Sequence, residues 1–278
     1  MNNTFSFNRF KDLLLKDGKM YIRNFGTNLI ALCCMTAILW IFTLLFGTSA
    51  QGASRFAIIV ASTIFSMMIV PSKVYGNANL SREGVGFAML PASSLEKFVS
   101  MFLYCAIVTP IVVFFGGYLV DALLSVFPFG GFEKPIHLYT INDFVRMMDN
   151  SEGVIQNGNM ELSFGDVFPI AVIRTSLYVG IIQWAAIFML GNMLFKKHKA
   201  GKTLVCYMGI SYVFSTLFGL SFITNGRLEQ WLESLEDLSE AEMIQLAHNG
   251  TIWAMIIGII ILGVLLYFTY RKIKTQKY

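Results

Sequence analysis

Charge is scarce in this chain. Only 14% of its 278 residues are Asp, Glu, Lys or Arg, whereas 55% are hydrophobic. A soluble globular protein carries about 25% charged residues. The deficit, together with a mean hydropathy of +0.62, excludes an ordinary soluble domain and predicts a membrane protein with several spans.

The residues that build metal and catalytic sites are also few. The three histidines are far apart in sequence, and the four cysteines lie in apolar runs without a Cys-x-x-Cys spacing. We expect these cysteines to behave as small buried hydrophobic side chains. No Gly-x-Ser-x-Gly or His-Glu-x-x-His motif is present. The sequence therefore predicts no enzyme, no metal or other cofactor, and no nucleic-acid partner.

A complete nucleotide-binding loop is missing as well. Residues 200–203, Ala-Gly-Lys-Thr, resemble the end of a P-loop, but Lys196 stands where that motif requires its first glycine. An apolar helix, rather than a strand, is predicted before them. We interpret 196–202 as a basic loop, so any ATP hydrolysis would need another chain.

Six apolar segments are present, and a bilayer-spanning helix needs roughly 20 residues. They cover about Leu29–Phe46, Phe56–Pro71, Phe98–Val120, Val167–Phe195, Thr203–Thr224 and Ile252–Tyr270. The short second segment is expected to borrow residues from Gly52 onward, and Pro110 is expected to kink the third. None of the six contains Asp, Glu or His, which argues against a proton relay. The predicted fold class is an all-α polytopic membrane protein with six transmembrane helices in a single domain over 1–278.

The basic residues predict the orientation. Sixteen of the 21 Lys and Arg lie in four segments, namely 1–27, 71–98, 196–202 and 271–278. Lys and Arg favour the cytoplasmic side, so both termini are expected there. Residues 5–23 show the pattern of a basic amphipathic helix, and 1–27 is predicted to lie in the cytoplasmic membrane interface.

The two long outer regions are acidic. Residues 121–166 contain seven Asp and Glu against two basic residues, and residues 223–249 contain six against one. We expect 121–166 to be an outer loop. Hydrophobic spacing in 225–250, with a capping box formed by Ser239 and Glu242, predicts two short amphipathic helices at the outer membrane face.

The polar stretch 72–97 separates the second and third apolar segments on the predicted cytoplasmic side. Ser93 followed by Glu96 is a capping box, in which each side chain bonds a free backbone N–H at a helix start. Pro91 ends whatever element precedes it. The stretch is therefore predicted to be a short cytoplasmic element that leads into a membrane helix.

A few polar or small residues within the spans are candidates for function. Arg174 is the one charged residue in a span, and it either anchors the outer interface or lines a translocation path together with Gln183. Ser211, Ser215 and Gly219 recur at four-residue steps, which suits a dimer interface or close packing within the chain.

This layout resembles that of type-2 ABC transporter permeases. The shared features are an interfacial N-terminal helix, six spans, a cytoplasmic element after span two, a basic loop after span four and an outer helical pair. The string Leu90-Pro91-Ala92-Ser93-Ser94-Leu95-Glu96-Lys97-Phe98 is similar to one in permease-like proteins of Bacteroidetes-type bacteria.

The resemblance implies a permease in the bacterial inner (cytoplasmic) membrane, surrounded by membrane lipid. It implies a separate ABC ATP-binding subunit and a homodimer or a heterodimer with a related permease. The stretch 72–97 would then be a coupling helix, whose expected contacts with the ATPase are Arg82, Glu83, Leu90, Ser93, Leu95, Glu96 and Lys97. The apolar spans favour export of an amphiphilic substrate. The alternative is a non-transporting membrane scaffold or sensor that binds through its acidic outer regions.

Overall fold

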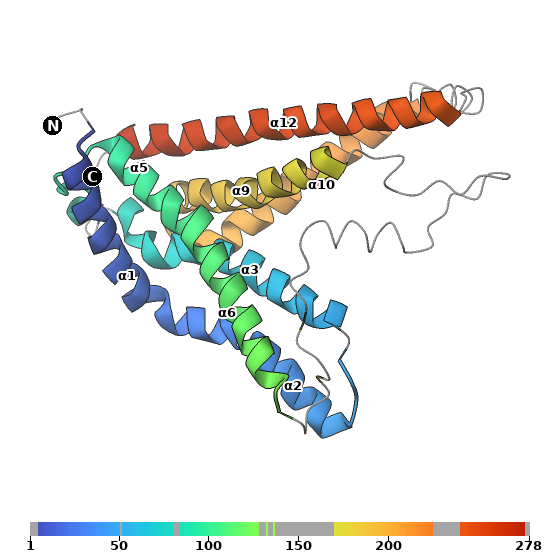
Figure 1. Cartoon of the computed structure of the whole chain (residues 1–278). Helices are drawn as coiled ribbons and strands as arrows, with labels where there is room; N and C mark the ends of the chain where they lie inside the picture. The colour runs from blue at the N-terminus through green and yellow to red at the C-terminus, as the bar shows by residue number, and fades with distance from the viewer. Residues whose placement is uncertain are drawn as a thin grey trace. The chain divides into compact units, whose positions relative to one another are not determined.

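The computed structural model describes residues 5–50, 52–80, 84–127, 132, 136, 170–224 and 240–275. Throughout these residues the regular elements are helices, as the all-α prediction requires (Figure 1). The chain divides into two compact units. Unit 1 comprises Met1–Leu138, Ile181–Thr203 and Leu262–Tyr278, and unit 2 comprises Tyr139–Gly180 and Leu204–Ile261.

The chain begins with two helices that follow each other almost without interruption. α1 spans Phe7–Cys33 and α2 spans Met35–Phe46, with only Cys34 between them. The helix predicted at 5–23 is therefore continuous with the first apolar segment, because no proline separates them. α2 ends at Gly47, whose positive φ of 61° is the left-handed conformation that glycine adopts without strain.

α3 spans Gly52–Val74, so the second segment does extend back to Gly52 as predicted. The helix continues through Pro71, where the apolar segment ends, for three more residues. The short helices η1, Gly76–Asn79, and α4, Gly84–Ala88, follow.

The third apolar segment forms one long helix with an altered middle. It consists of α5, Ser94–Phe102, the π-helical η2, Leu103–Val108, and α6, Thr109–Leu124. Pro110 has no N–H to donate to the preceding turn, and the Thr109 hydroxyl instead donates to the Tyr104 carbonyl at 2.6 Å. The helix has a π-helical turn just before Pro110, and the kink predicted at that residue stays a prediction.

The remaining described helices are α9, Ile170–Leu194, α10, Lys199–Thr224, and α12, Glu240–Thr275. α12 has 36 residues and is about 54 Å long at 1.5 Å per residue. The prediction of a separate short helix ending near residue 250 was wrong, because 240–250 form the first turns of α12. Residues 225–239 and most of 121–166 lie outside the described residues.

Five helices of the described part are long and apolar enough to cross a membrane. They are Phe7–Phe46, Ser54–Val74, Ser94–Leu124, Ala171–Leu194 and Ile244–Thr275. This supports a multi-pass membrane protein. The fifth predicted segment, Thr203–Thr224, falls in α10, which is not among the five helices, so the six-span topology stays a prediction.

Unit 1 has a hydrophobic core to which most of its helices contribute. Tyr21 and Phe25 of α1 meet Met101 and Cys105 of the α5–η2 segment. The other buried members are Leu32, Val70, Val74, Tyr75, Ala78, Val113, Met189, Met193 and Ile273. α1 and α5 run side by side in this unit (Figure 1).

The α9–α10 hairpin closes tightly within unit 1. A Cβ atom at Gly191 would lie 1.9 Å from the Thr203 hydroxyl oxygen, so no larger residue fits there without movement. Thr203 donates to the Lys199 carbonyl at 2.7 Å, which turns its side chain back along α10. The Gly-Lys-Thr sequence that resembles a P-loop lies inside this helix rather than in a loop.

Unit 2 contains the first turns of α9, most of α10 and the first part of α12. A Cβ added at Gly258 of α12 would lie 3.7 Å from the Val179 side chain of α9, so these two helices pack closely. Residues 205–217 of α10 are exposed on every side of the helix.

Candidate functional site

Described residues of the four basic segments come together within unit 1. The Asn192 side-chain amide donates to the Tyr75 carbonyl at 3.2 Å, and the buried Lys199 ammonium donates to the Gly76 carbonyl. Burial lowers the pKa of Lys199. The Tyr270 ring of α12 lies 5.9 Å from the Phe98 ring of α5. The segments that the charge pattern predicts on one side of the membrane are therefore neighbours in space.

The start of α5 is fixed by the predicted capping box. The Glu96 N–H donates to the Ser93 hydroxyl at 3.2 Å, and the Ser93 N–H donates to Glu96 Oε2 at 2.7 Å. The other oxygen, Oε1, accepts from the Ser6 N–H at 2.7 Å and from the Arg9 guanidinium at 3.3 Å. Glu96 is fully buried. One carboxylate therefore joins the beginning of α1 to the beginning of α5.

Lys97 connects α5 to α4. Its ammonium donates to the carbonyls of Phe87 at 2.8 Å and Ala88 at 3.1 Å, and it lies 5.3 Å from the centre of the Phe87 ring. A cation at the end of a helix satisfies carbonyls that have no partner within the helix. Lys97 thus holds the short α4 against the start of α5.

Among the described residues of this element, the exposed side chains are apolar. Val85, Met89 and Leu95 are exposed, and Met89 is 80% exposed. Ser93, Glu96 and Lys97 are buried, so these three side chains serve contacts within the chain. The candidate docking surface consists of Val85, Met89 and Leu95.

A buried polar cluster lies beneath α1 and α5. The carboxylate of Asp17 accepts from the Ser100 hydroxyl at 2.6 Å and from the Tyr75 hydroxyl at 3.1 Å. Burial raises the pKa of Tyr75 well above its usual value, and the Asp17 charge raises it further, so the phenol stays a donor. Asp17 was not singled out from the sequence. Its i±4 spacing from Leu13 and Tyr21, which are also buried, was the available signal.

A second buried polar contact links α3 and α6. Arg55 Nε donates to Asp121 Oδ1 at 2.9 Å, and Arg55 Nη2 donates to Oδ2 at 2.5 Å. The guanidinium also lies 4.0 Å from the centre of the Phe132 ring, and the Ile136 N–H donates to Asp121 Oδ2 at 3.3 Å. Sequence reasoning missed this pair, because 66 residues separate its members and no local pattern marks it.

Carboxylates do lie in the helices that are long enough to span a membrane. Asp17, Glu96 and Asp121 fall within such helices, although they lie outside the shorter apolar segments drawn from the sequence. All three are buried and hydrogen-bonded. The absence of Asp, Glu and His, which argued against a proton relay, therefore holds only for the six apolar segments and not for the full helices.

The other predicted site residues are distributed along the chain. Arg82 and Glu83 lie outside the described residues, and Leu90 is half-buried just after α4. Arg174 belongs to the part of α9 in unit 2, whereas Gln183 is half-buried in the part of α9 in unit 1. Ser211, Ser215 and Gly219 belong to α10, and both serines are exposed.

Within the described residues, no group of three or more His, Cys, Asp or Glu side chains could hold a metal ion. No protein-family model, curated protein or solved structure matches the chain. The arrangement that stands out chemically is the α4–α5 element, with an apolar outer surface and a buried, charged attachment to α1.

Proposed function

We propose that this chain is the membrane-spanning permease subunit of an ABC transporter, and that a separate ATP-binding subunit docks on α4 and the start of α5. The observation that carries the proposal is the apolar surface formed by Val85, Met89 and Leu95. It belongs to a short helical element that is fastened to two long helices. An exposed apolar patch of this kind marks a protein contact when it lies in water.

The charges around the element support its position outside the lipid. The surrounding segments carry most of the Lys and Arg of the chain, which favours the cytoplasmic side. Lipid tails would then not cover Met89. An ATP-binding subunit, a cytoplasmic protein, has access to that side.

The buried attachments supply a route for motion. Lys97 ties α4 to α5, and Glu96 ties α5 to α1 through Ser6 and Arg9. A displacement of α4 on ATP binding would move the starts of both long helices, because packed elements shift as bodies. The chain itself lacks a complete P-loop, so the energy comes from the partner.

The remaining parts of the proposal concern the membrane and the cargo. The protein is placed in the bacterial inner membrane with both termini in the cytoplasm and six spans. Two permease chains would meet through α10, where Ser211 and Ser215 are exposed, and would export an amphiphilic substrate. Arg174 and Gln183 are the candidate residues of the path.

The test is co-purification of the tagged full-length chain from native membranes, with mass spectrometry of its partners. We expect a subunit that carries a Walker A motif. Met89→Lys should lower its recovery about tenfold or more, because a charge would be buried in an apolar contact. Val126→Lys is the matched control, since Val126 is 78% exposed just after the opposite end of the α5–α6 helix, and it should leave recovery unchanged.

Two results would contradict the proposal. One is equal recovery of the ATP-binding subunit with Met89→Lys and the unmodified chain. The other is a purified complex that contains no ATP-binding subunit but does contain outer-face proteins, which would favour the scaffold or sensor.

A further inference from the structure

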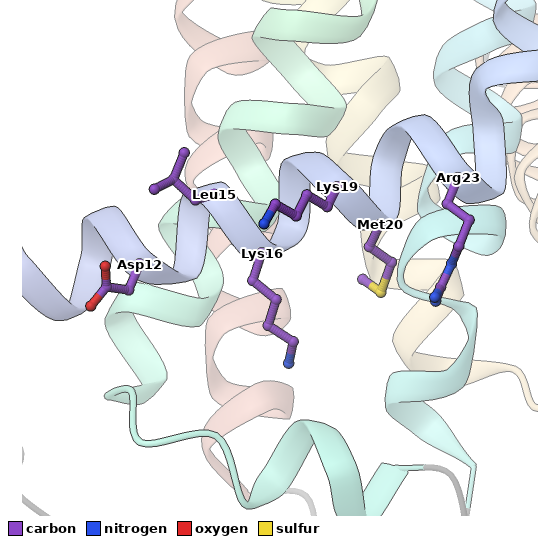
Figure 2. Close-up of a pocket in the computed structure, with 6 residues that line it drawn as sticks. All are labelled: Asp12, Leu15, Lys16, Lys19, Met20 and Arg23. Atoms are coloured by element: carbon purple, nitrogen blue, oxygen red, sulfur yellow. The ribbon is translucent and has the colours of Figure 1, made fainter.

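α1 carries an open groove of about 440 Å³ that the proposed ATPase contact does not use. Its lining residues all belong to α1 and are Asp12, Leu15, Lys16, Lys19, Met20 and Arg23. Figure 2 shows Lys16, Met20 and Arg23 projecting from the same side of the helix. The lining therefore combines three cations, one carboxylate and two apolar side chains.

The three cations lie on one face because they are three and four residues apart. Lys16, Lys19 and Arg23 are all exposed. The ion pairs found among the described residues join Arg9 to Glu96 and Arg55 to Asp121, so neither neutralises the groove. The groove thus has an excess of positive charge and suits an anion.

An exposed apolar stripe runs along the same helix beside these cations. Leu15, Ile22 and Ile30 are exposed, and steps of seven and eight residues put them on one face. The buried stripe that starts at Leu13 and Asp17 lies on the other side of the cations. Around its axis, α1 therefore presents a protein-facing side, a basic side and an apolar side open to the surroundings.

We infer that the groove binds the phosphate of an anionic phospholipid whose acyl chains cover the apolar stripe. Lys and Arg near a membrane surface attract anionic headgroups, and an amphipathic helix places its apolar side in the lipid. An amphiphile matches both adjacent sides of α1. The inference requires a membrane around the chain but not an ATP-binding partner.

Two other possible ligands match only the cations of α1 and not its apolar stripe. A free phosphate would use the cations but leave Leu15 and Ile22 exposed. An acidic segment of a partner protein would also use the cations, but it offers nothing matched to an apolar stripe that continues to Ile30 inside a candidate membrane span.

The experiment is native mass spectrometry of the full chain, purified in detergent and titrated with phosphatidylglycerol, phosphatidylcholine or glycerol phosphate. The test variant is K16Q/K19Q/R23Q. The matched control is K196Q/K197Q/K202Q, which removes the same charge from exposed lysines of another basic segment. The test variant should bind phosphatidylglycerol at least about tenfold more weakly than the unmodified chain does, since each of the three cations adds to the attraction of the anionic headgroup. The control should change less than about twofold.

A second variant is expected to bind phosphatidylglycerol more tightly, a result that misfolding would not produce. Asp12→Asn removes the carboxylate of the groove and should tighten phosphatidylglycerol binding about twofold or more. Equal loss in both triple variants would overturn the inference, as would equal binding of phosphatidylcholine. Competition by glycerol phosphate at the concentration of the lipid would identify a free-phosphate site instead. Unchanged lipid binding, with loss of a co-purified protein partner, would identify a protein contact and also overturn it.

Discussion

The sharpest prediction concerns the ion pair between Arg55 and Asp121. Both side chains are almost fully buried, at 3% and 1% exposure, and two hydrogen bonds of 2.9 Å and 2.5 Å join them. Asp121→Asn removes the negative charge while keeping a side chain of nearly the same size. The Arg55 guanidinium would then lose the negative charge of Asp121 while staying buried beside the Phe132 ring.

Removing one partner of a buried ion pair costs about 3–5 kcal/mol, because the other charge stays desolvated. A change of 1 kcal/mol shifts Tm by roughly 2–4 °C in domains of 150–250 residues. Asp121→Asn should therefore lower Tm by about 6–20 °C. Arg55→Met should have a similar effect, since it leaves the Asp121 carboxylate with the Ile136 N–H but no cation.

The assay is thermal unfolding of the detergent-purified chain, followed with a dye that fluoresces on reaction with thiols. Cys105 is fully buried and becomes reactive on unfolding. The double variant R55M/D121L replaces the pair by apolar side chains and should stay within about 2 kcal/mol of the unmodified chain. Arg9→Met is the comparison for an ion pair whose cation is partly exposed, and it should cost less than Asp121→Asn because Glu96 keeps the N–H donors of Ser6 and Ser93.

Two outcomes would refute the reasoning. A Tm within 2 °C of the unmodified chain for Asp121→Asn would mean that the carboxylate charge contributes little. A double variant as unstable as the sum of the two single variants would mean that the two side chains act independently rather than as a pair.

Two further stability predictions follow from helix ends and helix contacts. Ser93→Ala removes the acceptor of the Glu96 N–H and should cost about 1 kcal/mol, a fall in Tm of roughly 2–4 °C in the same assay; no change would show that the cap is dispensable. Gly191→Ala would force its Cβ to within 1.9 Å of the Thr203 hydroxyl and should lower Tm. Gly201→Ala, with no atom within 4 Å of the added Cβ, should leave Tm unchanged or raise it, and equal effects of the two would contradict the close packing.

Several features of the fold were predicted from local patterns. The capping box of Ser93 and Glu96 is present as expected, because its members are three residues apart and bond each other's backbone. α9, Ile170–Leu194, lies close to its predicted apolar segment, Val167–Phe195, whereas the first segment, Leu29–Phe46, covers the end of α1 and all of α2. The predicted ends were less accurate where a helix continues into polar residues, as it does at the beginning of α12.

The candidate site was predicted only in part. The sequence indicated a polar element before α5, and the structure has α4 and the α5 start there. The role of its charges changed, because Glu96 and Lys97 face inward. The cause is long-range: Ser6 and Arg9, about 90 residues earlier, approach Glu96 only when α1 packs beside α5.

The sequence by itself determined that this is a helical membrane protein and where α5 begins. Hydropathy and capping act over one or a few turns, so they can be read from neighbouring residues. Only the tertiary structure decided that Glu96 joins α1 to α5, that Asp17 bonds Tyr75 and Ser100, and that Arg55 pairs with Asp121. Those partners are 58 to 90 residues apart, and burial in a shared interior, rather than any local pattern, selects them.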